Sequence, residues 1–330
     1  MTNVSISDLR KYGKTYNLSV LSVALVNHQK ANWKLASSNY RSLKQIRKTS
    51  FDFDHFRIDC QFNPERIRSS AADTGIQSIQ ARPCFLCNEN RPEEQNGIPY
   101  GDEFIILCNP YPIFPYHLTI PTLKHIPQLI EDHIQDFLHL TKDLQDFTVF
   151  YNGPECGASA PDHFHFQAGI RDFLPIEDEL PSLLADKSER IFFRPEVEVY
   201  AIHDYLRKML ILKSDEEKIL ADTLKKVIRL LEPSQSGPEP MLNLLGYFKS
   251  GVWHIVLIPR RTGRPSEYYA DEFEKILVSP AAVEMAGLLI LPREEDFFKI
   301  SKENIHSIYH QVSIGNDEFH TLTEQIKTLT

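Results

Sequence analysis

The order of apolar and polar residues predicts an α+β unit in the first half of the chain. Phe104–Cys108 and residues 147–151 are continuous apolar runs of strand length, and His117–Pro121 is a third short run of this kind. Residues 128–146 place Leu, Ile and Phe at intervals of three and four, which is the spacing of an amphipathic helix. The predicted order is strand, strand, helix, strand, loop and a further strand.

The second half shows a similar but weaker pattern. Residues 241–248 and 252–259 are two strand-like runs joined by a short break, which predicts a hairpin. The end of this hairpin resembles His117–Pro121, because both segments begin with His and end with Ile-Pro, so the second half is interpreted as a degenerate duplicate of the first. The other predicted elements are a short helix start at 7–12, a strand or helix at 19–26, strands at 51–62, 192–203 and 287–292, a connection at 172–186, and helices at 214–231, 280–286 and 297–312.

The segment before and within the last strand of the first unit contains the candidate chemistry. With the two-residue period of a strand, His163, His165 and Gln167 lie on one face, and Phe164 and Phe166 lie on the other. A single strand histidine is usually a polar residue with a satisfied hydrogen bond. Two imidazoles and an amide on one face, with aromatic residues between them, indicate a site, and a neutral imidazole is a nucleophile at cell pH.

This segment, Gly157-Ala-Ser followed by His-Phe-His-Phe-Gln, resembles the active-site strand of the histidine-triad (HIT) superfamily. It is most similar to the branch that contains galactose-1-phosphate uridylyltransferase, diadenosine tetraphosphate phosphorylase and GDP-galactose phosphorylase. The resemblance implies that His165 is a catalytic nucleophile that carries a nucleotidyl group, and that Gln167 is a catalytic amide that binds phosphate. Asp162 makes the preceding loop one residue longer than in the uridylyltransferases.

Further substrate contacts are expected from the loops around this strand. Asn152 and Ser159 follow the apolar run at 147–151, and Asn109 begins a proline-rich loop in which Tyr111 and Phe114 can stack on a base. Arg66 and Arg68 supply donors suited to phosphate, and relatives have a comparable arginine-containing segment near the nucleotide. The alternative is that these two arginines only lie on a surface loop.

A Cys-x-x-Cys pair, Cys84 and Cys87, indicates a zinc site that requires two more ligands. The resemblance to the uridylyltransferases supplies them as His125 and His163. A structural Zn²⁺ bound by these four residues would connect the loop of the cysteine pair to the strand of His165. The alternative is a redox-active or vestigial pair.

Composition limits the remaining function classes. The net charge of −9 gives no basis for general binding to nucleic acid or anionic membranes, and no apolar run is long enough to span a bilayer. The five cysteines, an odd number with one close pair, favour a reducing compartment, so we expect a cytoplasmic protein. The resemblance implies a monomer or a homodimer.

The predicted fold class is therefore α+β, with tandem HIT-like units of mainly antiparallel sheet flanked by helices, of which the second is degenerate. The predicted domains are an N-terminal extension (1–50), a catalytic unit (51–175) and a second unit (176–330). The expected activity is that of a nucleotidyltransferase or phosphorylase acting on a nucleotide sugar or dinucleoside polyphosphate, with phosphate or a sugar phosphate as the acceptor. An amide at position 167 cannot protonate a leaving group, which favours leaving groups that are already phosphates. The alternative is a HIT-type nucleotide hydrolase or a non-catalytic nucleotide-binding protein.

Overall fold

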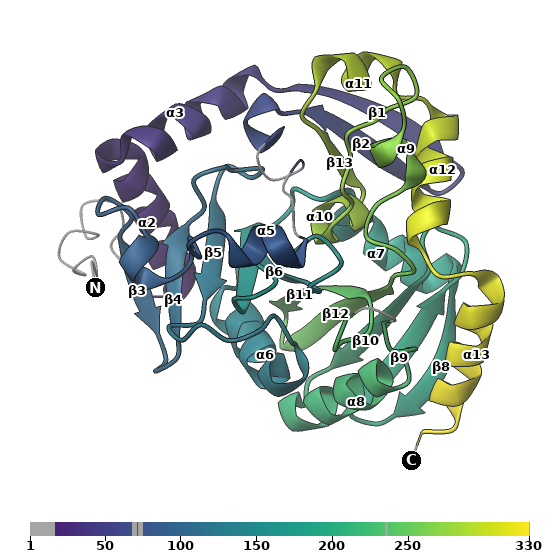
Figure 1. The fold of residues 1–330 in the computed structure, drawn as a ribbon. Coiled ribbons are helices and arrows are strands. Elements are labelled where there is room, and N and C mark those ends of the chain that lie inside the picture. The colour runs from purple at the N-terminus through teal and green to yellow at the C-terminus, as the bar shows by residue number, and fades with distance from the viewer. Residues whose placement is uncertain (1–16, 68–70, 72–74, 235–236, 330) are drawn as a thin grey trace.

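A computed structural model describes residues 17–67, 71, 75–234 and 237–329. Most strands form one ten-stranded antiparallel sheet, which runs from β3 at one edge to β8 at the other (Figure 1). The predicted helix start at 7–12 and Arg68 lie outside the described residues.

The first half of the chain forms one side of this sheet in the order β3-β4-β5-β7-β6. Helix α6 follows β5 in the chain, as the apolar spacing predicts, and packs on β6. The elements are β3 (Gly97–Tyr100), β4 (Phe104–Cys108), β5 (His117–Pro121), α6 (Ile134–Asp143), β6 (Phe147–Asn152) and β7 (His165–Ile170).

The second half forms the other side in the order β8-β9-β10-β12-β11, which is the same arrangement of strands. Helix α8 follows β10 just as α6 follows β5, and the two helices pack on each other. The elements are β8 (Ser188–Arg194), β9 (Val197–Ile202), β10 (Met209–Ser214), α8 (Glu217–Arg229), β11 (Leu242–Lys249) and β12 (Val252–Pro259). The two halves join where β6 pairs with β11.

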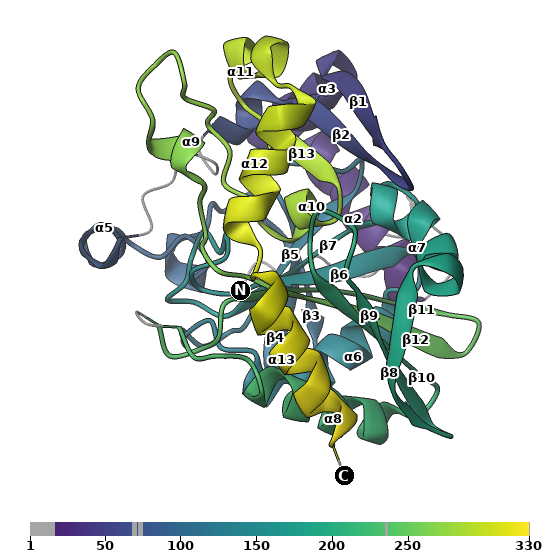
Figure 2. The ribbon, with the colours of Figure 1, turned by 90° about the vertical axis from the view of Figure 1, so that its right-hand side faces the viewer.

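A second, three-stranded sheet lies above the large one (Figures 1 and 2). Its strands come from distant parts of the chain, and β13 pairs with β2 in parallel. This sheet consists of β1 (Arg47–Phe53), β2 (Phe56–Phe62) and β13 (Leu288–Leu291). With α7, α10, α11 and α12 it covers one face of the large sheet and encloses one of two apolar cores.

The second core covers the opposite face of the large sheet, beneath α2, α3, α6, α8 and α13. Phe164 and Phe166 are completely buried in it, so the aromatic side of the predicted alternation is confirmed. The remaining helices are α2 (Leu18–Asn32), α3 (Lys34–Ser42), α5 (Ile76–Gln80), α7 (Pro175–Asp186), α9 (Ser266–Tyr269), α10 (Ala282–Met285), α11 (Glu294–Lys299), α12 (Lys302–Val312) and α13 (Asn316–Lys327), with single 3-10 turns at Leu43–Gln45, Pro64–Arg66, Asn88–Asn90 and Glu131–His133.

The α+β class with antiparallel sheets flanked by helices is confirmed, but several predicted elements are wrong in detail. Residues 51–62 and 192–203 each contain a turn and belong to hairpins, β1–β2 and β8–β9. The connection predicted at 172–186 contains helix α7, because Pro175 occupies the first helical turn, where proline is tolerated. The similarity between 254–259 and His117–Pro121 is also misplaced, because the strand order matches β12 to β7 and not to β5.

None of the described helices is both long and apolar enough to cross a membrane.

Candidate active site

The side chains of His165, Asn152 and Asn243 lie in a row across the face of the sheet that is opposite the aromatic core. Phe150 of β6 pairs with Gln167 of β7, and continuing this register by two residues brings Asn152 opposite His165. Asn152 in turn pairs with Asn243 of β11. The row therefore crosses from the first half of the chain into the second.

The hydrogen bonds of His165 fix its tautomer. The imidazole is 3% exposed, and its Nδ1 lies 2.8 Å from the carbonyl oxygen of His163. Because a carbonyl only accepts, Nδ1 must hold the proton, and Nε2 keeps its lone pair. Nε2 bonds to none of the described residues. Burial lowers the pKa of His165 to about 4, which keeps the ring neutral.

The side chain of Gln128 bonds to the backbone of β6 and β7 where the pairing of these two strands ends. Its Oε1 accepts from the His165 backbone N–H at 2.7 Å, and its Nε2 donates to the carbonyl oxygens of His165 and Asn152, at 2.9 and 3.0 Å. The paired register of β6 and β7 ends at Phe150 and Gln167. One buried amide thus replaces the missing strand pairing and sets the spacing between His165 and Asn152.

Gln167 is oriented by two neighbours with fixed roles. The backbone N–H of Ile113 donates to Nδ1 of His117 (3.2 Å), so Nε2 of His117 holds a proton and faces Oε1 of Gln167 at 3.1 Å. Burial, followed by the nearby Arg66 guanidinium, lowers the pKa of His117 to about 3 and keeps it neutral. Asn109 also donates to Oε1 of Gln167, at 3.4 Å. The NH₂ group of Gln167 therefore points away from these donors and can serve as a donor itself.

Asn152 is oriented in the same way. Its Oδ1 accepts from the backbone N–H of Ala282 at 2.8 Å and from the side chain of Asn243 at 3.0 Å. Its NH₂ group bonds to none of the described residues. The side-chain amides of Asn152 and Gln167 thus both keep a free donor.

The other predicted contacts occupy different positions around the row. Arg66 donates to the carbonyl oxygen of Tyr111 at 2.8 Å, and its buried Nε lacks a described partner. Asn109 donates to Gln167, and its side-chain oxygen accepts from the backbone N–H of Tyr111 at 2.9 Å. The backbone oxygen of Ser159 accepts from Arg82 at 2.6 Å. Phe114 is 1% exposed and packs edge-on against His117, so the prediction that it stacks on a base is wrong.

The four predicted metal ligands come together. The ligand atoms of Cys84, Cys87, His125 and His163 all lie within 4.8 Å of one another. Nδ1 of His163 lies 3.3 Å from the Cys84 sulfur, and Nδ1 of His125 lies 3.2 Å from the Cys87 sulfur. Such a group of donor atoms can hold a metal ion.

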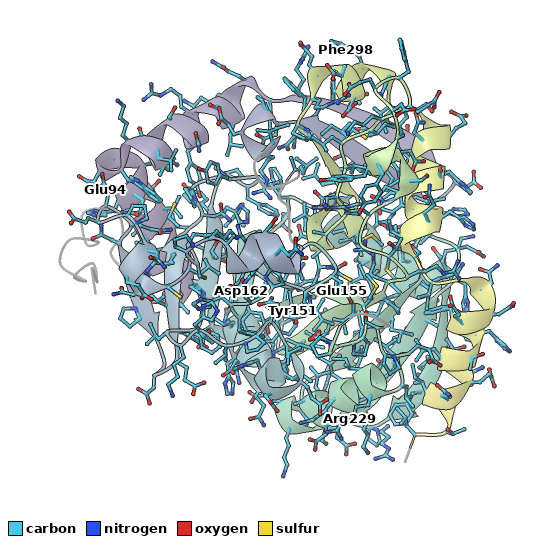
Figure 3. The ribbon with its side chains drawn as sticks, viewed as in Figure 1. Glu94, Tyr151, Glu155, Asp162, Arg229 and Phe298 are labelled. Atoms are coloured by element: carbon cyan, nitrogen blue, oxygen red, sulfur yellow. The ribbon has the colours of Figure 1, made fainter. Side chains whose placement is uncertain are left out.

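The outer partners of the two histidines fit a metal site. Nε2 of His163 lies 2.9 Å from the carbonyl oxygen of Thr122, which directs the Nδ1 lone pair toward the sulfurs. Nε2 of His125 lies 3.4 Å from a carboxylate oxygen of Asp162, one of the residues labelled in Figure 3. His163 lies in the turn before β7 and not on the strand, because its backbone N–H bonds to Ala160 and its ring turns toward the cysteines.

A cavity of about 1070 Å³ lies beside the loop that leads to His163. It is bounded by residues 154–159 of this loop, residues 259–264 and helix α13. Ser159 is the predicted site residue that lines this cavity, whereas His165 and Gln167 do not line it. Gly157 has φ +97° in the same loop, and a Cβ atom there would lie 2.4 Å from Cβ of Ala281, so only glycine fits.

The sequence analysis missed Gln128, His117 and Asn243. Gln128 and His117 have no local signal, because their partners in the candidate site are far away in the sequence. Asn243 does have one, because it interrupts an apolar run of strand length in which asparagine is disfavoured.

Comparisons with known proteins agree with this architecture. Residues 25–170 match a family model described as a domain of unknown function (DUF4922), and residues 182–330 match the GDPGP1-like C-terminal domain. No curated protein matches the sequence significantly.

Two of the similar solved structures are complexes of the yeast Ap4A phosphorylase Apa2. The complex with Ap4A has a TM-score of 0.55 at 16% identity and covers 86% of this chain and 97% of that one. The complex with AMP has a TM-score of 0.54 at 16% identity, with coverages of 87% and 96%. A GalT-like protein from Arabidopsis thaliana has a TM-score of 0.35 at 14% identity, with coverages of 82% and 99%. The chain thus has the fold of the Ap4A phosphorylase structures, and its residues 182–330 match the GDPGP1-like C-terminal domain.

Proposed function

We propose that the protein is a nucleotidyltransferase or phosphorylase that forms a covalent nucleotidyl-histidine at His165. The observation that carries this proposal is the Nε2 atom of His165, a lone pair with no described partner, on a strand position whose neighbours Gln167 and Asn152 each keep an NH₂ group without a described partner. The proposed substrate is a nucleotide sugar or a dinucleoside polyphosphate. The acceptor is phosphate or a sugar phosphate.

In the first step, the Nε2 lone pair attacks the α-phosphorus, and the bond from phosphorus to the bridging oxygen breaks. The leaving phosphate takes the electron pair of that bond, and the imidazole becomes a cation whose Nδ1–H stays bonded to the His163 carbonyl. The NH₂ groups of Gln167 and Asn152 donate to the phosphoryl oxygens as charge develops on them. In the second step, an acceptor oxygen attacks phosphorus, and the P–N bond breaks to restore Nε2.

We also assign a zinc ion to Cys84, Cys87, His125 and His163, whose donor set suits tetrahedral Zn²⁺. Bound zinc would crosslink the cysteine loop to the turn before β7. His163 would then hold its carbonyl oxygen fixed for Nδ1 of His165. The metal in this role supports the geometry of the strand and does not touch the substrate.

The test is to incubate the protein with α-³²P-labelled UDP-, GDP- and ADP-sugars and diadenosine polyphosphates, denature it, and measure the bound label. We expect one of these compounds to leave label on the protein, and phosphate or a sugar phosphate to release it. His165→Ala should abolish labelling. His139→Ala is the matched control, because this exposed histidine lies on α6 and pairs with Glu217.

Two results would contradict the proposal. Label that water alone removes quickly would favour a hydrolase of the same superfamily. Tight binding of a nucleotide with no label on the denatured protein would favour a non-catalytic nucleotide-binding protein.

A further inference from the structure

The orientation of Asn152 is determined by residues of the second half of the chain. Asn152 ends β6, and its Oδ1 receives two hydrogen bonds, from the Ala282 backbone and from Nδ2 of Asn243. Both groups can only donate at these positions. If the amide of Asn152 rotated by 180°, its NH₂ group would face two donors, so the side chain is held in one orientation.

Asn243 is itself held in one orientation. Its Nδ2 donates to the carbonyl oxygen of Cys156 at 2.8 Å, and its Oδ1 accepts from Nη1 of Arg260 at 2.5 Å. A carbonyl oxygen cannot donate, and a guanidinium cannot accept. The residue is completely buried, so no water is available to replace either bond.

Arg260 completes the chain of contacts. Its side chain is 4% exposed, and its other donors go to the carbonyl oxygens of Val312, Pro280, Thr262 and Gly263, at 2.9 to 3.3 Å. None of these hydrogen-bond partners is a carboxylate. Burying a cation is costly, and the buried Glu284 carboxylate nearby offsets part of this cost without bonding to the guanidinium. A guanidinium cannot accept, so Arg260, together with the Cys156 carbonyl, prevents Asn243 from turning over.

We infer that Asn243 and Arg260 are positioning residues for the phosphoryl-transfer step. Through hydrogen bonds they fix Asn152 so that its NH₂ group, and not its carbonyl oxygen, faces the phosphate on His165. This inference rests on the proposed function. It gives the second half of the chain a part in the reaction, although that half contributes no nucleophile.

The test uses Asn243→Asp, which keeps the size of the side chain and pairs with Arg260 but cannot donate to Asn152. We expect the single-turnover rate of labelling at His165 to fall roughly 10- to 100-fold, since loss of one oriented donor costs about 10²- to 10³-fold. The midpoint of urea unfolding should also fall, because an aspartate oxygen would face the Cys156 carbonyl with no proton between them, so the rates are compared on folded protein. Asn243→Ser, which is neutral and too short to reach Asn152, should show the same loss of rate if the aspartate variant fails to fold.

A double-mutant cycle separates positioning from a purely structural effect. In an Asn152→Ala background, Asn243→Asp should cause no further loss of rate, because its effect passes through Asn152. Gln29→Ala, which removes a buried amide with two hydrogen bonds on α2, is the control for loss of stability and should keep the labelling rate.

The outcomes distinguish the two proposals. Absence of label on the wild-type protein would reject the proposed function itself. A wild-type protein that is labelled, with Asn243→Asp labelled at the same rate, would overturn the positioning role alone. Effects of Asn152→Ala and Asn243→Asp that simply multiply would overturn it as well.

Discussion

The two halves of the large sheet have the same strand order, but the residues on one face are polar in the first half and apolar in the second. In the first half, β7 places His165 and Gln167 on the face beneath the small sheet. The matching strand of the second half, β12, places Val256 and Ile258 on that face, where they are buried in an apolar core. The polar end of this face is the proposed site in one half, whereas in the other half the face only packs.

This difference shows how a strand arrangement can be used twice for different purposes. Positions that hold a nucleophile must keep part of the surface open, and this costs buried apolar area. At the corresponding positions, the second half has apolar residues that are buried in the core. Among the described residues, both groups that could ligate a metal also lie in the first half.

The largest expected effects come from matched substitutions on the two equivalent strands, β7 and β12. His165→Ala should reduce formation of the labelled intermediate by at least about 10³-fold, because the nucleophile is lost, with little change in stability. Val256→Ala on β12 should do the opposite: it should lower the free energy of unfolding by about 2 kcal/mol and leave the rate of the folded protein unchanged. Urea denaturation and single-turnover labelling measure the two quantities. A loss of rate in both variants would mean that the halves are not chemically distinct.

Removal of the metal should have the next largest effect. Cys87→Ser should reduce bound zinc from about one per chain to near zero and lower the unfolding midpoint, because metal binding adds to folding stability. Cys60→Ser, a change at a buried cysteine of the small sheet, should keep the zinc. Mass spectrometry of the native protein and thermal unfolding check both variants. Wild-type protein without zinc after expression with excess metal would contradict the assignment.

A pH effect on stability is expected at Glu239, a carboxylate of the second half that is buried against residues of the first half. Glu239 is 6% exposed, accepts from the Ile130 backbone and the Tyr151 hydroxyl, and has a pKa that burial raises to about 7. The folded protein keeps this proton between pH 4.5 and 7 while the unfolded chain loses it, so this group's contribution to stability falls as pH rises through that window. The total loss is about 3 kcal/mol. Glu239→Gln should remove it, as a comparison of urea unfolding of the variant and the wild type at pH 5 and pH 8 will show.

The smallest effect is expected at Arg261, beside the buried Arg260. Its ion pair with Glu318, at 2.7 Å, is about half exposed on both sides. Such a pair contributes less than about 1 kcal/mol, so Arg261→Ala should barely move the urea midpoint. A loss of more than about 2 kcal/mol would show that this surface pair helps to hold α13 in place.

The local sequence pattern predicted those elements that are defined by one amphipathic face or by one apolar run. The apolar runs gave β4, β5 and β6, the hairpin gave β11 and β12, and the four metal-ligand candidates do come together. Turns inside the alternating segments were missed, although Asp54-His55 shifts the apolar positions from odd to even residue numbers and Pro195 places a proline inside the second run. The final predicted helix at 297–312 is divided between α11 and α12, and α13 was not predicted.

The hydrogen-bond partners of the site could not be predicted for a different reason. Asn243 meets Asn152 across 91 residues, and Glu239 meets Tyr151 across 88. These contacts form only when the two halves pair through β6 and β11. These contacts require fixed donors and acceptors in a buried environment. This requirement produces no periodic pattern in the sequence.

The pairing of β6 with β11 also determines how the chain can be divided. If the chain were cut between the halves, β6, the strand beside β7, would become an edge with unpaired backbone groups. Exposed edges of this kind recruit other strands, so a truncated first half would be prone to aggregate before it could bind any nucleotide. Engineering of this protein should therefore treat both halves as one inseparable piece.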